Sequence, residues 1–218
     1  MRNSGKIKKK KVLFYKFFKS FFDFLFATLL LVVGFPFFLV ISLLIKFSSR
    51  GPIFYKQKRL GKNKTEFYCI KFRTMHPEAE SMLITLLEKD EKIKDEFNKD
   101  YKIKNDPRIT NIGLFLRKTS LDELPQFINV IRGEMSIVGP RPIVKEEIEK
   151  YGKKFLQVFS VKPGITGLWQ ISGRNNLSYD RRVALDLIYS EEISLLLDLR
   201  IILRTFGVIL FPKDKGAY

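Results

Sequence analysis

The feature that most constrains this chain is a hydrophobic segment of 22 residues, from Phe24 to Ile45, that contains no charged residue. As a straight α-helix it would be about 33 Å long, enough to cross the ~30 Å hydrocarbon core of a bilayer. A secretory signal has a shorter apolar region followed by a small-residue cleavage site, whereas "KFSSRGP" follows here. We therefore expect the segment to stay in the protein and to associate with a membrane.

Pro36 lies in the middle of this segment. A proline inside a helix removes a backbone hydrogen bond and clashes with the preceding turn, at a cost of about 3 kcal/mol. Neither half, Phe24–Val33 or Phe37–Ile45, is long enough to span a bilayer alone. Eight Lys and Arg precede the segment and seven lie between Lys46 and Lys64, and basic flanks are typical of the cytoplasmic side. The pattern favours a re-entrant hairpin bent at Pro36, and a kinked single-pass helix remains the alternative.

The positive charge of the chain is concentrated around this segment. The net charge is +17, but residues 1–64 hold 15 Lys and Arg against one acid and carry +14, which leaves +3 for residues 65–218. A nucleic-acid-binding protein is expected to carry its basic patch on the folded domain. The distribution therefore predicts anionic membrane lipids as partners and no nucleic acid, with a disordered basic tail as the alternative for residues 1–12.

The chain has one cysteine, Cys69, and one histidine, His76. A single cysteine excludes an intramolecular disulfide. A single histidine excludes a mechanism that needs two histidines and a metal site built from several of them. Nothing around His76 supports a Ser–His–Asp triad.

Residues beyond the hydrophobic segment predict a small, mainly helical α+β domain. Pro52–Met75 has the composition of two short strands around a turn at Gly61–Lys64. Lys162–Asn176 is rich in Gly and polar residues and predicts an ordered loop. Ile193–Leu210 is strongly apolar and predicts a helix that lies on the membrane surface or in the core. Further helices are predicted over Pro77 to about Asn98, Asp122–Ile131 with Gly133 as its stop, Val144–Gln157 and Tyr179–Tyr189.

The stretch "RKTSLDELPQ" places two carboxylates, Asp122 and Glu123, side by side. Ser120 and Glu123 match the S-x-x-E pattern of a capping box, which is an ordinary helix start. With Ser120 as the cap, however, Pro125 would be the fifth helical residue. With Asp122 as the cap, Pro125 falls in the first turn, where its missing N–H costs nothing. Either way, Asp122 is expected to be ionised and to lie near a helix N-terminus, and such a terminus favours the binding of phosphate.

Basic residues punctuate the predicted turns: Lys71, Arg73, Arg108, Arg117, Arg141 and Arg174. Arg141 lies between two prolines, which stiffen its backbone. Arginine binds phosphate oxygens bidentately, although any one of these residues alone is more often an ordinary surface residue. Two carboxylates with several cations and no supporting histidine suit phosphoryl transfer. In such a site a carboxylate is the nucleophile or holds Mg²⁺, while the cations neutralise the phosphates.

Five motifs follow one another over nearly the whole chain: "SRGPIFYKQKRLGKN", "FYCIKFRTM", "NDPRITNIGLFLRKTSLDELPQFINVIRGEMSIVGPRP", "KPGITGLWQISGRN" and "LDLRIILRTFGVIL". With them, the chain from about Phe17 to Tyr218 resembles the bacterial sugar transferase family, the monotopic phosphoglycosyl transferases. It is most similar to the branch that transfers hexose-1-phosphate, such as the undecaprenyl-phosphate galactose phosphotransferases.

The resemblance implies roles for the candidate residues. Asp122 and Glu123 match the Asp–Glu dyad of the family, in which the Asp forms a phosphosugar–aspartyl intermediate and Mg²⁺ is required. Glu123 would bind the metal with Asp122 or tune the nucleophile. The expected phosphate- and substrate-binding residues are Arg117 and Arg141 by family position, Lys71 and Arg73 as additions, and Arg174 at the nucleotide or sugar.

The resemblance also implies a function and an architecture. The expected reaction moves a hexose-1-phosphate, with galactose or glucose as the sugar, from a UDP-sugar to undecaprenyl phosphate and releases UMP. This would be the first membrane step of polysaccharide, exopolysaccharide or O-antigen assembly at the bacterial cytoplasmic membrane. A membrane-bound glycosyltransferase that releases UDP is the alternative.

The expected parts of the chain are a basic segment (1–16), a re-entrant hairpin (17–48) and a cytosolic catalytic domain with interfacial helices (49–218). A homodimer is compatible with this layout. The family bends its hairpin at Ser–Pro, whereas Phe35 precedes the proline here.

Overall fold

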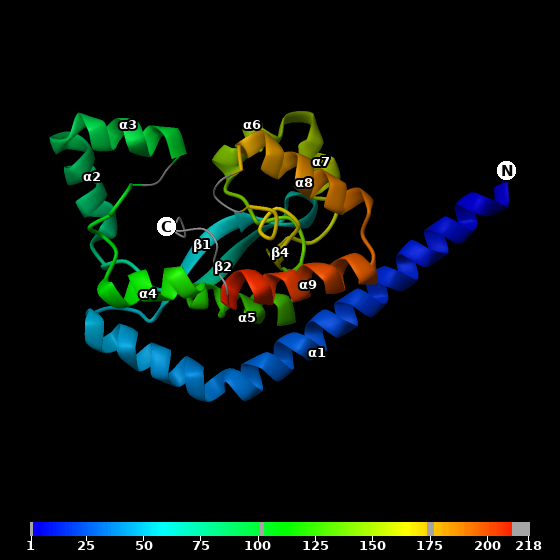
Figure 1. Cartoon of the computed structure of the whole chain (residues 1–218), viewed down its shortest axis with the longest axis horizontal. Helices are drawn as coiled ribbons and strands as arrows, with labels where there is room; N and C mark the ends of the chain where they lie inside the picture. The colour runs from blue at the N-terminus through cyan, green and yellow to red at the C-terminus, as the bar shows by residue number, and fades with distance from the viewer. Residues whose placement is uncertain (1, 101–102, 174–176, 211–218) are drawn as a thin grey trace. The chain divides into compact units, whose positions relative to one another are not determined.

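The computed structural model describes residues 2–100, 103–173 and 177–210 (Figure 1). These residues form two compact units. Unit 1 is built from residues within 1–34, 56–70 and 125–216, and unit 2 from residues within 35–55 and 71–124. The elements in chain order are α1 (Arg2–Ser48), β1 (Phe54–Leu60), η1 (Lys62–Lys64), β2 (Glu66–Phe72), α2 (Ala79–Lys89), α3 (Glu91–Asp100), α4 (Asn111–Thr119), η2 (Leu121–Glu123), α5 (Gln126–Ile131), β3 (Ser136–Val138), η3 (Lys145–Glu147), α6 (Ile148–Tyr151), η4 (Gly152–Lys154), α7 (Phe155–Val158), β4 (Gly164–Thr166), α8 (Tyr179–Glu191) and α9 (Leu195–Leu210).

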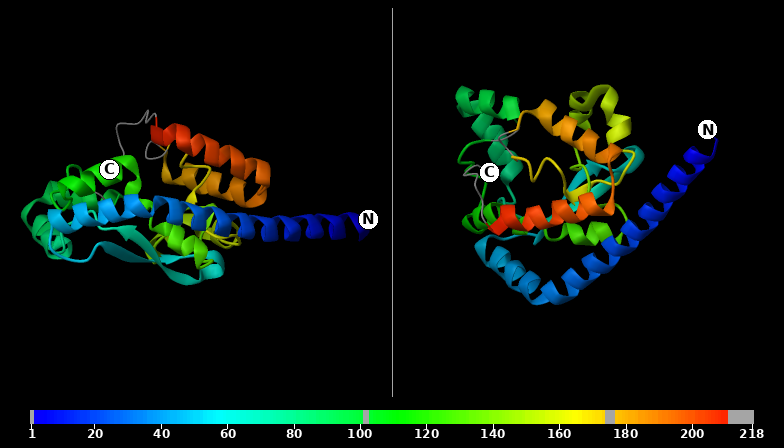
Figure 2. Two further views of the ribbon diagram at one scale, coloured as in Figure 1. Left: turned by 90° about the horizontal axis from the view of Figure 1, so that it is seen from below. Right: turned by 45° about the vertical axis from the view of Figure 1, so that its right-hand side comes forward.

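The expected mainly helical fold with a small two-stranded sheet is confirmed. β1 and β2 pair with each other, joined by the short turn η1 at the predicted position (Figures 1 and 2). A second pair, the parallel strands β3 and β4, was not predicted. Each of these strands has three residues, which is too short for an alternating pattern to stand out from the sequence around it.

α1 is a single helix that contains Pro36 in its interior, rather than two helices separated by a break. One proline removes one hydrogen bond, and the turns on both sides keep theirs. Within the described residues, one stretch, Phe17–Ser48, is long and apolar enough to cross a membrane. Many of its apolar side chains are exposed, including Phe35 and Phe37 beside the proline.

Several predicted helices differ from those observed. The helix expected over Val144–Gln157 is divided into the short pieces η3, α6, η4 and α7, and Gly152 with φ +51° separates the two middle ones. The helix expected from Pro77 is divided at Asp90, whose backbone is extended. Gly133, with φ +75°, follows α5 and confirms the predicted stop.

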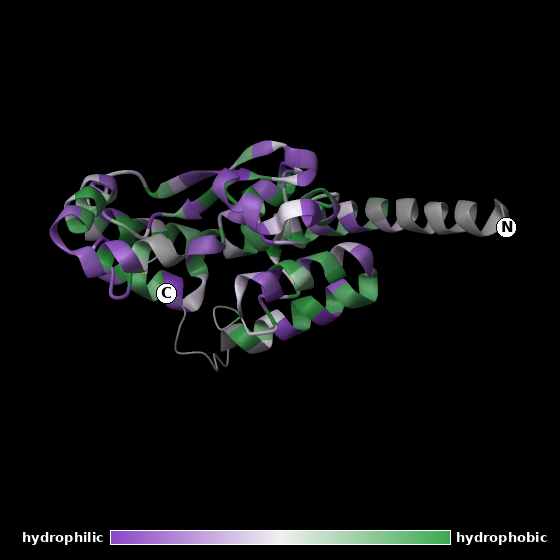
Figure 3. Ribbon diagram, turned by 90° about the horizontal axis from the view of Figure 1, so that it is seen from above, coloured by the Kyte–Doolittle hydropathy of each residue, from purple (hydrophilic) through white to green (hydrophobic). Residues whose placement is uncertain are grey.

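α9 is the helix expected over Ile193–Leu210, and the structure bears out its expected place in the core for one of its faces. Its hydrophobic residues are interrupted by hydrophilic ones (Figure 3). Asp198 and Ile201 are buried, and the helix packs on β3 and β4. Leu196 and Leu203 on the same helix are exposed. One face therefore belongs to the core of unit 1, and the other, which carries exposed leucines together with Arg200 and Arg204, is uncovered by the described residues.

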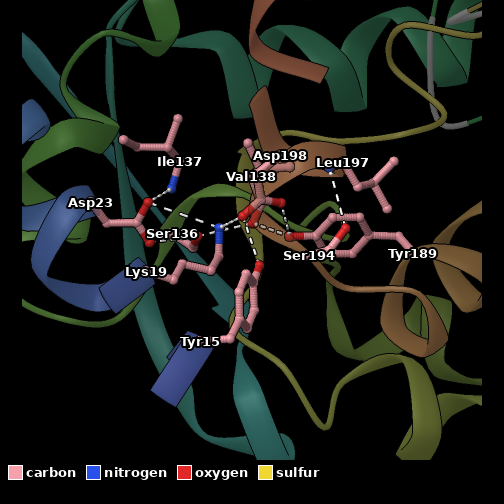
Figure 4. A network of polar contacts seen from close by, with 10 residues as sticks. All are labelled: Tyr15, Lys19, Asp23, Ser136, Ile137, Val138, Tyr189, Ser194, Leu197 and Asp198. Carbon is pink, nitrogen blue, oxygen red and sulfur yellow. Dashed lines mark hydrogen bonds and ion pairs between the residues drawn. The ribbon is translucent and has the colours of Figure 1, made fainter. Parts of the chain in front are cut away.

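A polar network holds the first half of α1 within unit 1 (Figure 4). Asp198 of α9 accepts hydrogen bonds from the Tyr15 hydroxyl at 2.7 Å, the Lys19 ammonium at 2.7 Å and the Tyr189 hydroxyl at 2.8 Å. Lys19 also lies 3.9 Å from Asp23. Asp23 in turn accepts a 2.7 Å hydrogen bond from the hydroxyl of a β3 serine. Lys19 and Asp23 of α1 thus belong to one buried network rather than being isolated surface charges.

The second half of α1 shares a core with the elements of unit 2. Ile41 and Ile45 are buried in a cluster with Phe72 of β2 and Leu116 of α4. The Phe38 ring lies 5.5 Å from the Phe72 ring, centroid to centroid. The end of α1 is therefore packed against the elements that carry the candidate site.

Candidate active site

The dyad follows directly from the end of α4 in unit 2. The Thr110 side chain accepts a hydrogen bond from the Gly113 N–H and starts this helix. Ser120 ends it in the left-handed conformation, with φ +58°, and donates its N–H to the Arg117 carbonyl. η2 begins at the next residue and carries Asp122 and Glu123.

The capping arrangements that we expected for this region are not observed. Ser120 makes no side-chain cap, because its left-handed backbone differs from the extended backbone of an N-cap residue. Asp122 lies inside η2, and α5 begins only at Gln126, directly after Pro125. Pro125 therefore lies at the entrance of the helix, where its missing N–H has no cost.

Glu123 and Asp122 have different surroundings. The Lys71 Nζ lies 2.6 Å from Glu123 Oε1, and both side chains are partly shielded from solvent. Asp122 is 9% exposed and has no ion pair with any residue that the structure describes. Lys71 is on β2. This strand therefore supplies a cation to Glu123, whereas Asp122 has no ion pair among the described residues.

The pKa of Asp122 is raised from 3.8 to about 6. Burial is the main cause and the neighbouring Glu123 carboxylate adds to it, while Lys71 and Arg117 oppose the rise. At neutral pH the group is still mostly ionised, but it is a stronger base than an ordinary aspartate. This environment is typical of catalytic carboxylates.

The raised pKa predicts a pH-dependent stability. Between about pH 4 and pH 6 the folded state holds a proton on Asp122 that the unfolded state has released, so stability falls as the pH rises through this window. Asp122→Asn removes the buried charge. We expect the variant to gain about 2 kcal/mol over wild type at pH 7.5 and little at pH 4, measured by denaturant unfolding in detergent. A gain that is equal at both pH values, or equal to that of the exposed control Asp95→Asn, contradicts this expectation.

Arg117 is held close to the dyad by a residue that we did not select from the sequence. Its Nε donates a 3.0 Å hydrogen bond to the hydroxyl of Thr74, which follows β2. Burial lowers the pKa of Arg117, and the Asp122 carboxylate opposes this. Thr74 also accepts the Thr110 N–H through its carbonyl at 3.0 Å. Its position in "KFRTM", beside two basic candidates, is the only signal in the sequence that could have identified it.

The other basic candidates have separate surroundings. The Arg73 guanidinium donates to groups at the end of α1. Arg108 forms a fork-like pair with Asp106, with bonds of 2.8 and 2.6 Å. Arg141 belongs to unit 1, where its guanidinium carbon lies 6.0 Å from the centre of the Trp169 ring. Arg174 lies outside the described residues.

The donor set at the dyad fits Mg²⁺ bound together with a substrate. The described residues contain no group of three or more His, Cys, Asp or Glu that could hold a metal ion. Mg²⁺ commonly uses one or two carboxylates and takes its other ligands from substrate phosphates and water. Asp122 and Glu123 are adjacent and could supply those carboxylates.

Residues 14–212 match the family described as Bacterial sugar transferase. This match covers almost the whole chain. The chain belongs to the bacterial sugar transferase family. Asp122, Glu123, Lys71 and Arg117 all lie within the matched region, so the clustered residues of unit 2 are part of a sugar transferase.

Curated members of the family are similar in sequence over most of the chain. Exopolysaccharide production protein ExoY of Rhizobium meliloti is 44% identical over 92% of this chain and 88% of its own length. Undecaprenyl-phosphate galactose phosphotransferase of Salmonella typhimurium is 44% identical over 93% of this chain and 42% of its length. UDP-glucose:undecaprenyl-phosphate glucose-1-phosphate transferase of Klebsiella pneumoniae is 39% identical over 92% and 41%. The chain thus spans most of the first protein and less than half of the other two.

Proposed function

We propose that this sugar transferase moves a hexose-1-phosphate, with galactose or glucose as the sugar, from a UDP-sugar to undecaprenyl phosphate and releases UMP. One observation carries the proposal. Lys71 pairs with Glu123, whereas Asp122 is buried, has a raised pKa and has no ion pair among the described residues. A buried carboxylate flanked by cations is suited to attack a phosphate. The names of two relatives, a galactose phosphotransferase and a glucose-1-phosphate transferase, support the substrates.

In the first step, a carboxylate oxygen of Asp122 attacks the phosphorus that bears the sugar. The bond from that phosphorus to the bridging oxygen breaks, and UMP leaves with the oxygen. Arg117 and Lys71 lie close enough to Asp122 to interact with it electrostatically. Their positive charges would stabilise the negative charge that develops on the phosphates. Mg²⁺ held by Asp122 and Glu123 would supply further neutralisation of this charge.

In the second step, a phosphate oxygen of undecaprenyl phosphate attacks the same phosphorus. The bond to Asp122 breaks, the carboxylate is restored, and the sugar leaves on a lipid diphosphate. Glu123 stays paired with Lys71, so this cation is held beside the reacting carboxylate through both steps. Splitting the transfer in this way lets the soluble donor and the lipid acceptor react one after the other.

Two features support a re-entrant path for α1 on the cytoplasmic side, the proline in its interior and its basic flanks. Its first half is bonded to Asp198 through Lys19, and its second half packs on Phe72 through Phe38. Asp198 and Phe72 both belong to the chain beyond α1, in which the described residues contain no second helix able to span a membrane. The basic flanks point to the same side for both ends.

This topology makes a direct prediction. Reporter tags placed before Met1 and after Tyr218 are both expected in the cytoplasm, because the helix between them enters and leaves at one surface. Protease protection in sealed inner-membrane vesicles of known orientation measures this. Tags on opposite sides of the membrane would show a spanning helix and contradict the proposal.

The reaction is tested with a panel of UDP-sugars and undecaprenyl phosphate, with the released nucleotide identified by chromatography. We expect UMP, formed with UDP-galactose or UDP-glucose. Release of UDP would instead support the alternative, a glycosyltransferase that moves the sugar alone. The lipid product then carries a diphosphate in the first case and a monophosphate in the second, so its mass gives an independent reading.

A further inference from the structure

Arg73, expected at the phosphate site, has its guanidinium engaged elsewhere. Its Nη2 donates to the Ser49 carbonyl at 2.8 Å and to the Ser49 hydroxyl at 2.9 Å. Its Nη1 donates to the Arg50 carbonyl at 3.1 Å. The residue is only 7% exposed. Three bonds and this burial leave little of the guanidinium fork for a substrate phosphate.

The groups that Arg73 binds form the exit of the membrane helix. α1 ends at Ser48, and the Ser49 and Arg50 carbonyls that Arg73 binds follow it directly. A cation close to the last turn also favours the helix dipole. Arg73 therefore places a cation, bonded to two backbone carbonyls, at the point where the chain leaves the proposed membrane segment.

Gly51 shows how closely the two segments approach each other. Its backbone has φ +129°, which side chains rarely tolerate. A Cβ built at this position would overlap Arg73 Nη1 and would lie 2.9 Å from the Pro77 ring. The turn after α1 therefore needs a glycine so that the guanidinium can lie against it.

Arg73 is also fixed to the strand that serves the dyad. It follows directly after β2, and its N–H donates to the Ile53 carbonyl at 2.8 Å. Lys71, the partner of Glu123, lies two residues earlier on the strand. Phe72, between the two, packs in the cluster that contains Ile45 of α1. One short segment thus joins the end of the membrane helix to the cation beside the catalytic carboxylates.

We propose that Arg73 is a positioning residue that clamps the end of α1 to β2, and that it serves the transfer to the lipid acceptor rather than donor binding. This rests on the proposed function. The acceptor phosphate lies at the headgroup level, so its approach to Asp122 depends on how the membrane helix is held. The donor is soluble and meets Asp122, Lys71 and Arg117, to none of which Arg73 is bonded.

The two half-reactions separate these roles. Arg73→Met is assayed for the covalent sugar-phosphate adduct with UDP-sugar alone, and then for transfer to undecaprenyl phosphate in nanodiscs. We expect adduct formation within about threefold of wild type, and transfer at low acceptor concentration reduced at least about tenfold. Ser49→Ala removes one acceptor of the clamp and keeps Arg73, and it is expected to show a smaller loss in the transfer step alone. Arg108→Met removes an equally buried guanidinium from the same unit. It is expected to show no loss that is confined to the transfer step.

A third measurement does not depend on turnover. Trypsin cleavage after Arg50, mapped by mass spectrometry in nanodiscs, is expected to be about tenfold faster in Arg73→Met, because the clamp covers that peptide bond. Loss of the adduct in Arg73→Met with no effect of Ser49→Ala would assign Arg73 to the donor phosphates and overturn the proposal. Unchanged cleavage, or equal effects in Arg108→Met, would overturn it too. If wild type forms no adduct while the cleavage result holds, the clamp stands and the proposed reaction fails.

Discussion

Asp122→Asn is expected to lower the rate of sugar-phosphate transfer by about 10⁴-fold or more, because an amide cannot form the mixed anhydride with phosphorus. The variant should remain folded, because it replaces a buried carboxylate, which is unfavourable in its ionised form at neutral pH, by a neutral amide. Initial rates of UMP release with saturating UDP-sugar and undecaprenyl phosphate give the measurement. The gain in stability and the loss of activity should appear in the same preparation.

Two comparison variants give this result its meaning. Asp95→Asn changes an exposed acid on α3 of the same unit and should leave the rate unchanged. Glu123→Gln frees Lys71 to interact with Asp122, which would lower the pKa of the nucleophile and weaken it as a base. Its rate should fall less than that of Asp122→Asn. Near-normal UMP release by Asp122→Asn would exclude this residue as the nucleophile.

Asp198→Ala is expected to destabilise the protein by about 3–5 kcal/mol, the cost of leaving one member of a buried ion pair without its partner. The carboxylate accepts three hydrogen bonds, from Tyr15, Lys19 and Tyr189 (Figure 4). Burial, followed by the adjacent Asp198 carboxylate, raises the pKa of Tyr189, so its hydroxyl keeps the proton that it donates. Denaturant unfolding in detergent, at matched protein and detergent concentrations, measures the loss.

The exposed acid Glu192, at the end of α8, provides the control, and Glu192→Ala should change stability by less than about 0.5 kcal/mol. A double-mutant cycle identifies the interaction itself. Lys19→Met with Asp198→Ala should cost at least about 1 kcal/mol less than the two single changes added together. Strict additivity would show that the network does not couple α1 to α9.

The sequence was most informative where chemistry depends on residue type. The adjacent Asp122 and Glu123, with Lys71 and Arg117, indicated phosphoryl transfer, and the structure brings these four residues together in unit 2. The sequence alone could not show which basic residue lies at the dyad, because any of them could equally pair with a carboxylate or with a backbone carbonyl. Lys71 pairs with one acid of the dyad, whereas Arg73 binds carbonyls at the end of a helix.

The fold shows the same division. Long patterns predicted the apolar helix, the strand pair around η1 and the helix from Tyr179. Interactions between distant residues decided the rest. Ser120 and Asp122 were the two candidate caps of a following helix, but Ser120 closes the preceding helix and Asp122 lies inside η2. The acids Asp23 and Asp198 interrupt apolar helices, and each has a partner more than 100 residues away in the sequence, Ser136 for Asp23 and Lys19 for Asp198, which no local pattern can identify.

The most direct test of the account is intact-protein mass spectrometry of the enzyme after a single turnover with UDP-sugar and no lipid acceptor. We expect a mass increase equal to one hexose phosphate, located on Asp122 by peptide mapping, and its disappearance when undecaprenyl phosphate is added. No such adduct, together with kinetics that require both substrates to be bound at once, would contradict a covalent mechanism through Asp122.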